Sequence, residues 1–378
     1  MIKSKRMKSA VVAVMATFAI GSSVPTAPAA STTIELLIAA DTNIQTLWET
    51  VFIPAFVKEY PQYKVNVTFD RNGLREAQNT AKIIAAKETR RDPGVDLIDG
   101  GMAARLAVAG LLYRPSANLM PNLRDVSKVL VKQGNGQIPY RASTVLLAYN
   151  SKNVTKAPTT LNELLTWIKA NPGKFSYNVP SGGGSGYSFV QTVVDMNLTA
   201  AERLAMSVGP DKTIQTKWAK GLETLKDLNK FTYGKNGTYP ANNTATLNLL
   251  STGEIDMGTV WSDQFASARA AGTMPANIKV TAIKSPSLTG GPAWLGIPIN
   301  GGNRTGARLL ANFVLSPAMQ NAIMGGALKG IPVVKLSKLD PVLAEGFKDV
   351  DVTDMRAPYF GANSDDLKSA WSLAVPGK

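Results

Sequence analysis

The sequence contains no cysteine and no histidine among its 378 residues. Without cysteine the chain has no disulfide bonds, no thiolate metal ligands and no cysteine nucleophile. Without histidine it lacks the commonest general base and the commonest zinc ligand, so Ser-His-Asp and Cys-His catalysis are excluded. An enzyme made from this chain would need carboxylates, lysine, tyrosine or a bound cofactor.

Long apolar runs are also missing, because no stretch approaches the eighteen uninterrupted apolar residues typical of a membrane-spanning helix. The run Ala10–Ile20 has eleven residues and follows the basic residues Lys3, Lys5, Arg6 and Lys8. It is too short to cross a bilayer, which takes about 20 helical residues. The small residues that follow end in Ala27-Pro28-Ala29. This order is typical of a secretory signal peptide, so we expect residues 1–29 to be cleaved near Ala29 and the rest to be exported.

Positive charge dominates, with 41 Lys and Arg against 27 Asp and Glu and a net charge of +14. The predicted signal peptide carries four of these positive charges and no negative one, which leaves +10 on the remaining chain. A basic chain raises the question of nucleic acid binding. However, the basic residues are scattered without a run of five or six like charges, and export argues against such a partner. We therefore expect a solvated basic surface and no nucleic acid partner.

The hydropathy pattern predicts an α/β fold. With 44% hydrophobic and 18% charged residues, the composition is globular, and the length indicates two lobes. In the first half, strand patterns alternate with helical spacing, which predicts a largely parallel sheet with helices on both faces. The strands are expected at 33–39, 63–69, 95–98, 145–149, 175–179, 255–261 and 278–283, and the early helices at 43–59, 74–87 and 102–109.

Six segments taken in order carry a resemblance to a known family. They are FIPAFVKEYPQYKVNVTF (52–69), GVDLIDGG (94–101), IPYRASTVLLAYNSKNV (138–154), APTTLNELLTWIKANPGKF (157–175), STGEIDMGTVW (251–261) and LANFVLSPAMQNAIM (310–324). The ordered set resembles the extracellular solute-binding proteins of ABC importers, in the two-hinge class with maltose-, polyamine- and iron-binding members. No single segment is diagnostic, but the order is specific.

The resemblance implies a type II periplasmic binding protein, with two doubly wound α/β lobes joined by hinge strands. It implies crossings near 141–144 and 281–285, with residues 30–141 plus 285–325 in lobe 1 and residues 142–284 plus 326–378 in lobe 2. The solute binds between the lobes, and a hinge closes them around it. We therefore expect a monomer in the periplasm that is not an enzyme and needs no cofactor. It would deliver a small-molecule solute to an ABC permease in the inner membrane.

Polar and glycine residues after two strands are candidate ligand contacts. Asp41 and Asn43 follow the first strand, where Asp41 is either a polar anchor for ligand or a plain helix N-cap. Gly101 follows the third strand and either admits ligand close to the backbone or only permits the turn.

A glycine-rich loop supplies further candidates. Ser181, Gly184 and Ser185 lie in the run Ser181–Gly186, which leads into a predicted helix. Backbone N–H groups at a helix start favour an anion or a hydroxyl oxygen. The alternative is that these glycines only form a loop. Tyr187 follows and is a candidate for stacking or hydrogen bonding.

Aromatic and charged residues complete the candidate set. Trp261 and Asp263 stand at the end of a strand, and Trp294 lies past the second crossing. Indole faces suit sugar C–H groups or alkyl ammonium groups, although a core position is the alternative. Tyr140 and Arg141 lie at the first crossing, where Arg141 suits a carboxylate or phosphate or an interlobe salt bridge.

Three solute classes remain open. A sugar or polyol would use Trp261, Trp294, Asp41 and Asp263, and we favour it. An organic acid or phosphate ester would use the glycine-rich loop and Arg141. A polyamine would need several carboxylates, for which the candidates are only Asp41 and Asp263. We expect no metal ligand and no catalytic residue; the alternative from another class is an exported glycoside hydrolase that uses paired carboxylates.

Overall fold

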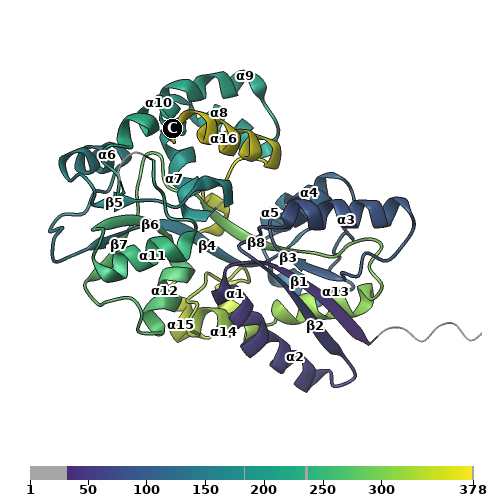
Figure 1. The fold of residues 1–378 in the computed structure, drawn as a ribbon. Coiled ribbons are helices and arrows are strands. Elements are labelled where there is room, and N and C mark those ends of the chain that lie inside the picture. The colour runs from purple at the N-terminus through teal and green to yellow at the C-terminus, as the bar shows by residue number, and fades with distance from the viewer. Residues whose placement is uncertain (1–31, 183, 235–236, 377–378) are drawn as a thin grey trace, which may run out of the picture. The chain divides into compact units, whose positions relative to one another are not determined.

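The computed structural model describes residues 32–182, 184–234 and 237–376 (Figure 1). The predicted signal peptide at residues 1–29 lies outside the described residues. Within these ranges, no helix combines the length and the apolar character needed to cross a membrane.

The strands form a continuous path of pairing in the order β2-β1-β3-β8-β4-β6-β5, with β7 paired to β4. β1 is parallel to β2 and β3, and β8 joins this group to β4 by antiparallel pairing. The strands are β1 Thr33–Ala40, β2 Lys64–Arg71, β3 Leu97–Asp99, β4 Ile138–Asn150, β5 Phe175–Ser176, β6 Met257–Trp261, β7 Ile278–Thr281 and β8 Gly290–Gly296. The predicted α/β class is confirmed.

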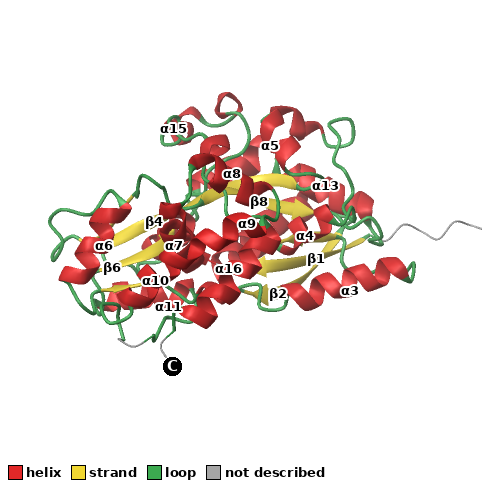
Figure 2. Ribbon diagram, turned by 90° about the horizontal axis from the view of Figure 1, so that it is seen from above, coloured by secondary structure: helices red, strands yellow, loops and turns green. Residues whose placement is uncertain are grey.

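Helices cover the sheet on both faces (Figure 2). Their bounds are α1 Thr42–Leu47, α2 Ile53–Glu59, α3 Glu76–Glu88, α4 Met102–Val108, α5 Lys128–Gln133, α6 Leu161–Ala170, α7 Gly184–Val194, α8 Ala200–Val208, α9 Lys212–Gln215, α10 Ala219–Leu228, α11 Asn243–Thr252, α12 Ser262–Ala270, α13 Arg304–Val314, α14 Pro317–Gly325, α15 Pro341–Glu345 and α16 Gly361–Ala374. Alternation along β1 explains the two-sided cover. Leu36 and Ile38 belong to one buried apolar cluster and Leu37 to another, because successive strand residues point to opposite faces.

Two separate cores define two lobes. The first lobe packs around clusters that include β1, α2, α4 and α13, and the second around clusters that include α6, α7, α11 and α16. β4 contributes to both, since Tyr140 and Ala142 lie in the first core while Val145 and Leu147 lie in the second. The chain therefore passes between the lobes within a single strand.

The C-terminal part of the chain divides between the two cores. Leu328, Ile331 and Leu339 pack in the first core, and only from Tyr359 onward do buried residues of the tail join the second. The resemblance implies that the whole of 326–378 belongs to lobe 2. The exact lobe boundaries stay a prediction, but the described packing favours a boundary near residue 356.

β8 is the strand that the sequence pattern did not predict. The second crossing was expected near 281–285, whereas the strand that pairs with both β3 and β4 is Gly290–Gly296. Its first three residues are Gly290, Gly291 and Pro292, and glycine and proline are depleted in strands. The local sequence of Gly290–Gly296 therefore does not predict a strand, although pairing with β3 and β4 stabilises one there.

The predicted helix at 43–59 is interrupted in the structure. A π-helical segment, Trp48–Phe52, separates α1 from α2, and Pro54 stands in the first turn of α2. Proline has no N–H to donate to the preceding turn, which accounts for the change in hydrogen-bond pattern there.

Candidate functional site

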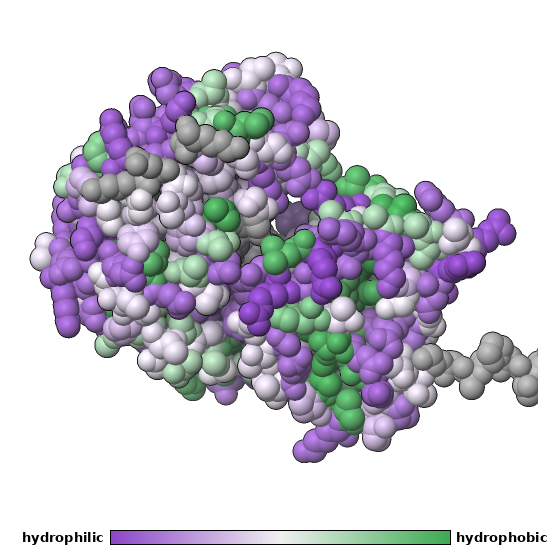
Figure 3. Space-filling view, viewed as in Figure 1, coloured by the Kyte–Doolittle hydropathy of each residue, from purple (hydrophilic) through white to green (hydrophobic). Residues whose placement is uncertain are grey.

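A cavity of about 300 Å³ lies where β1, β3 and β6 end. The surface is hollowed near the middle of the face in Figure 3. Residues that directly follow these three strands line the cavity, together with residues of β4 and β8. The lining consists of Ala39, Ala40, Asp41, Asn43, Ile44, Asp99, Gly100, Gly101, Ala104, Gln137, Arg141, Ser143, Trp261, Asp263, Gly291, Pro292, Ala293 and Trp294. Strand ends of this kind are where α/β folds bind ligands.

Asp41 is held by the opposite lobe rather than by its own helix. It stands at the N-terminus of α1, but its side chain makes no capping hydrogen bond. Instead, Oδ2 of Asp41 accepts a hydrogen bond of 2.9 Å from Nδ2 of Asn243 on α11. Burial raises the pKa of Asp41, the bond from Asn243 lowers it, and the nearby Asp263 carboxylate raises it further. The carboxylate therefore lines the cavity without serving as a cap.

Arg141 connects the two lobes through a buried network. Its Nη1 lies 2.8 Å from Oδ2 of Asp263, and its Nε donates to the Tyr140 hydroxyl over 2.9 Å. Both partners of the ion pair are buried, with side-chain exposures of 9% and 7%. This is the interlobe salt bridge that the sequence analysis gave as one of two alternatives for Arg141.

Asp99 is a cavity residue that the sequence analysis missed. Its Oδ2 accepts hydrogen bonds from the Tyr140 hydroxyl at 2.6 Å and from Nε1 of Trp48 at 2.7 Å. Burial raises the pKa of Asp99, against the opposing effects of Arg141 and the Tyr140 bond. A signal was present in the sequence, since Asp99 is the last residue of β3 and precedes two glycines.

The candidate aromatic residues take different places. Trp261 and Trp294 line the cavity and are half-buried. Tyr140 is fully buried and lies behind the cavity, where it joins Asp99 to Arg141. Gly101 and Asn43 are lining residues too.

The glycine-rich loop does not line this cavity. Ser181 is exposed in an open depression beside α16. Gly184 begins α7 with a φ of +71°, and a Cβ there would clash with the Asn243 side chain. The N–H groups of Ser185 and Gly186 donate to the side chains of Asn243 and Asn178 respectively. Tyr187 is buried in the second core. A ligand contact for Ser181, Gly184, Ser185 and Tyr187 therefore stays a prediction.

Another set of backbone amides beside the cavity is occupied by a side chain of the protein. The carboxylate of Glu76 on α3 accepts hydrogen bonds from the N–H groups of Gly101 and Met102, where α4 begins. Burial raises the pKa of Glu76 and these bonds lower it. The amides after β3 therefore already hold a negative group. Among the described residues, no group of three or more His, Cys, Asp or Glu side chains is arranged to hold a metal ion.

Comparison with known proteins gives one consistent result. The family model for bacterial extracellular solute-binding proteins matches residues 53–349. Protein YnjB of Escherichia coli strain K12 is 26% identical over 292 residues, which cover 74% of this chain and 73% of YnjB.

Solved structures agree in fold. An extracellular solute-binding protein from Bordetella parapertussis has a TM-score of 0.67 at 16% identity, with 91% of this chain and 98% of that chain covered. The periplasmic binding protein AfuA from Actinobacillus pleuropneumoniae, with fructose-6-phosphate bound, has a TM-score of 0.64 at 17% identity, with 91% and 99% covered. The predicted type II periplasmic binding fold is thus confirmed.

Proposed function

Because the chain belongs to the bacterial extracellular solute-binding proteins, we propose that it captures one small polar solute in the cavity at the ends of β1, β3 and β6. It would then present the closed, loaded form to an ABC permease in the inner membrane. In this role the protein binds and releases its solute without reacting with it.

The observation that carries this proposal is that both lobes contribute to one cavity. Asp41 and Asp99 belong to the first lobe, whereas Trp261 and Asp263 belong to the second. A solute that contacts both sets is enclosed when the lobes close, and its binding energy favours the closed form only through contacts that the open form lacks.

The cavity limits the size of the solute. At roughly 30 Å³ for each water molecule in the liquid, a volume of about 300 Å³ corresponds to about ten waters. This space suits a single sugar, polyol or amine rather than an oligosaccharide or a peptide.

The polar groups limit its chemistry. The guanidinium of Arg141 is engaged by Asp263 and Tyr140, and the amides of Gly101 and Met102 hold Glu76. An anion such as the fructose-6-phosphate of AfuA would therefore have to displace internal carboxylates. A solute that donates hydrogen bonds, a sugar or polyol or an amine, suits Asp41 and Asp99 better.

The protein would act outside the cytoplasm, as a single chain. Membership of an extracellular family supports export, and we propose cleavage near Ala29 and a periplasmic monomer. The permease is the proposed partner.

A binding screen tests the function. Mature protein purified from the periplasm is titrated with sugars, polyols, amines and organic acids, and each solute is then recovered and analysed by mass spectrometry. We expect 1:1 binding and chemically unchanged solute. Ligand at about 100 times its dissociation constant should stabilise the fold by about 2.7 kcal/mol. Consumption of a glycoside, or the lack of any stabilising solute, would overturn the proposal.

A further inference from the structure

Resting on the proposed function, we propose that the solute is a small organic cation, with one protonated amine or amidine group on an apolar or aromatic body. Three independent features of the cavity carry this proposal: its charge, its unpaired acceptor atoms and its indole rings.

The charge of the cavity is negative although the chain is basic. Its ionisable lining residues are Asp41, Asp99, Asp263 and Arg141. Arg141 is paired with Asp263, and its Nε donates to the Tyr140 hydroxyl, which in turn donates to Asp99. In the part of the chain that the structure describes, Asp41 forms no ion pair, and its carboxylate accepts a hydrogen bond from the neutral amide of Asn243. A partly buried carboxylate without a counter-charge is costly, so a ligand cation beside Asp41 is favoured. Burial is the largest influence on the pKa of Asp41 and raises it, whereas Arg141, which is engaged by Asp263, lowers it and is the smallest of the four influences.

Two of the lining side chains carry a buried acceptor atom without a partner among the described residues. Gln137 is only 7% exposed and its Nε2 donates to the Gly134 carbonyl over 3.0 Å. That bond orients the amide and leaves Oε1 of Gln137 without a partner among the described residues. Oδ1 of Asn43 also has no partner among them. Both residues line the cavity. A buried acceptor without a donor is unfavourable, so a ligand with N–H groups suits these two atoms better than a ligand that brings only acceptors.

The indole rings favour a cation with an apolar body. Trp261 and Trp294 both line the cavity, and indole is the strongest aromatic partner for a cation. A sugar also packs against indole, but a neutral sugar leaves the charge of Asp41 uncompensated. An anion would face Asp41 and Asp99, while Arg141 is engaged by Asp263.

The first test needs no variant. Wild-type protein is titrated with matched sets that share a body and differ in one group: benzylamine, benzyl alcohol and benzoate, and butylamine, butan-1-ol and butyrate. These titrations accompany the broad solute screen. We expect the amine of each set to bind more tightly than its alcohol and its acid, and the tightest solute of the screen to be cationic.

The outcomes separate this inference from the proposed function. If no solute of any charge binds, the proposed function fails. If the tightest solute is neutral or anionic, or alcohols and acids bind as tightly as their amines, the function stands and the cation inference is overturned.

A second test uses a charge-matched pair of variants. Asp41→Asn removes the charge of one carboxylate that lines the cavity. Asp349→Asn removes the charge of one carboxylate on the exposed surface. With melting temperatures and circular dichroism checked for both, Asp41→Asn should weaken amine binding about 10- to 100-fold, as expected for loss of a charge-assisted hydrogen bond. Asp349→Asn should leave it unchanged. Equal affinities in the two variants would contradict a role for Asp41 in binding a cation.

Discussion

Asn243 of the second lobe donates a hydrogen bond of 2.9 Å to the carboxylate of Asp41 in the first lobe, although the two residues are 202 positions apart. Oδ1 of Asn243 accepts from the N–H of Ser185 at the start of α7. One side chain thus connects the first turn of a second-lobe helix to a cavity carboxylate across the cleft. This arrangement makes Asp41 sensitive to closure, because the bond exists only when α11 is close to β1.

We predict that the affinity for an amine falls as the pH is lowered through the raised pKa of Asp41. The pKa of Asp41 is raised, mainly by burial, above the ordinary value of 3.8. Asp263 and Arg141 are the charged groups that act on it, and Asn243 is its hydrogen-bond partner. Because the cation binds the ionised carboxylate, affinity is complete above this raised pKa and is lost as the pH falls through it. Calorimetric titration with the tightest amine at several pH values measures the midpoint, which should lie above 3.8. In Asp41→Asn, the loss of affinity over this pH range should be absent or much smaller.

Trp261→Ala should weaken solute binding without unfolding the protein. Trp261 is half-buried at the cavity wall and packs in part against the second core, as Trp167 does, so truncation removes a stacking surface together with some packing. An aromatic contact of this kind contributes about 1 to 2 kcal/mol, which is roughly a 5- to 30-fold change in the dissociation constant. Trp167→Ala is the matched control, because Trp167 is also half-buried but lies on α6, away from the cavity lining. Similar dissociation constants for both variants would remove Trp261 from the site.

The buried ion pair of Arg141 and Asp263 should show strong coupling. Each single change, Arg141→Met or Asp263→Leu, leaves the other charge buried without its partner, which costs about 3 to 5 kcal/mol. The double variant removes both charges and should recover much of that loss. Urea denaturation of the four proteins gives the free energies of unfolding. Additive single effects would mean that the two charges are independent despite their separation of 2.8 Å.

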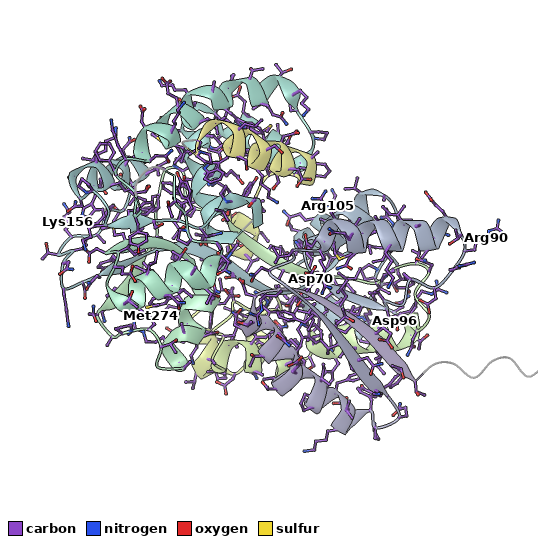
Figure 4. All side chains as sticks on the ribbon, viewed as in Figure 1. Asp70, Arg90, Asp96, Arg105, Lys156 and Met274 are labelled. Atoms are coloured by element: carbon purple, nitrogen blue, oxygen red, sulfur yellow. The ribbon has the colours of Figure 1, made fainter. Side chains whose placement is uncertain are left out.

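A second interlobe pair should have a small, salt-dependent effect. Arg105 lies on the side of α4 that faces α16 (Figure 4), and its Nη1 is 2.8 Å from Oδ2 of Asp365. Both side chains are about two-fifths exposed, so water and salt screen the interaction. Asp365→Asn should weaken solute affinity by no more than about fivefold at low salt and not measurably at 1 M salt.

Glu345→Gln is the control for this pair. It breaks an exposed ion pair with Lys348 that lies near α15, within the first lobe. It should therefore not change solute affinity at any salt concentration. An equal effect of the two substitutions would show that the Arg105–Asp365 pair has no specific part in closure.

Much of the site was predictable from sequence because it follows from sheet geometry. Asp41, Gly101 and Trp261 each stand near the carboxyl end of a strand, and such ends converge in an open α/β sheet. The pairing of Arg141 with Asp263 spans 122 positions, so only the folded chain identifies which carboxylate the guanidinium meets. Nothing in the sequence marks Asn243 as a residue of the candidate site, because an Asn near a helix start cannot be told from an ordinary N-cap.

The residues that sequence reasoning placed differently have physical explanations. Asp99 ends a buried strand in which apolar residues dominate, and its carboxylate accepts hydrogen bonds from Trp48 and Tyr140 of distant elements. The sequence of the glycine-rich loop suggests backbone N–H groups that bind a ligand. In the structure, the side chains of Asn178 and Asn243 accept the hydrogen bonds from two of these N–H groups at the start of α7. In both cases, tertiary hydrogen bonds determine the role of a locally ambiguous residue.

Because β4 passes through both cores, the two lobes are joined there by continuous, paired backbone and not by a loose loop. Residues on either side of Ala142 pack in different cores, so closure of the lobes requires dihedral changes within this strand.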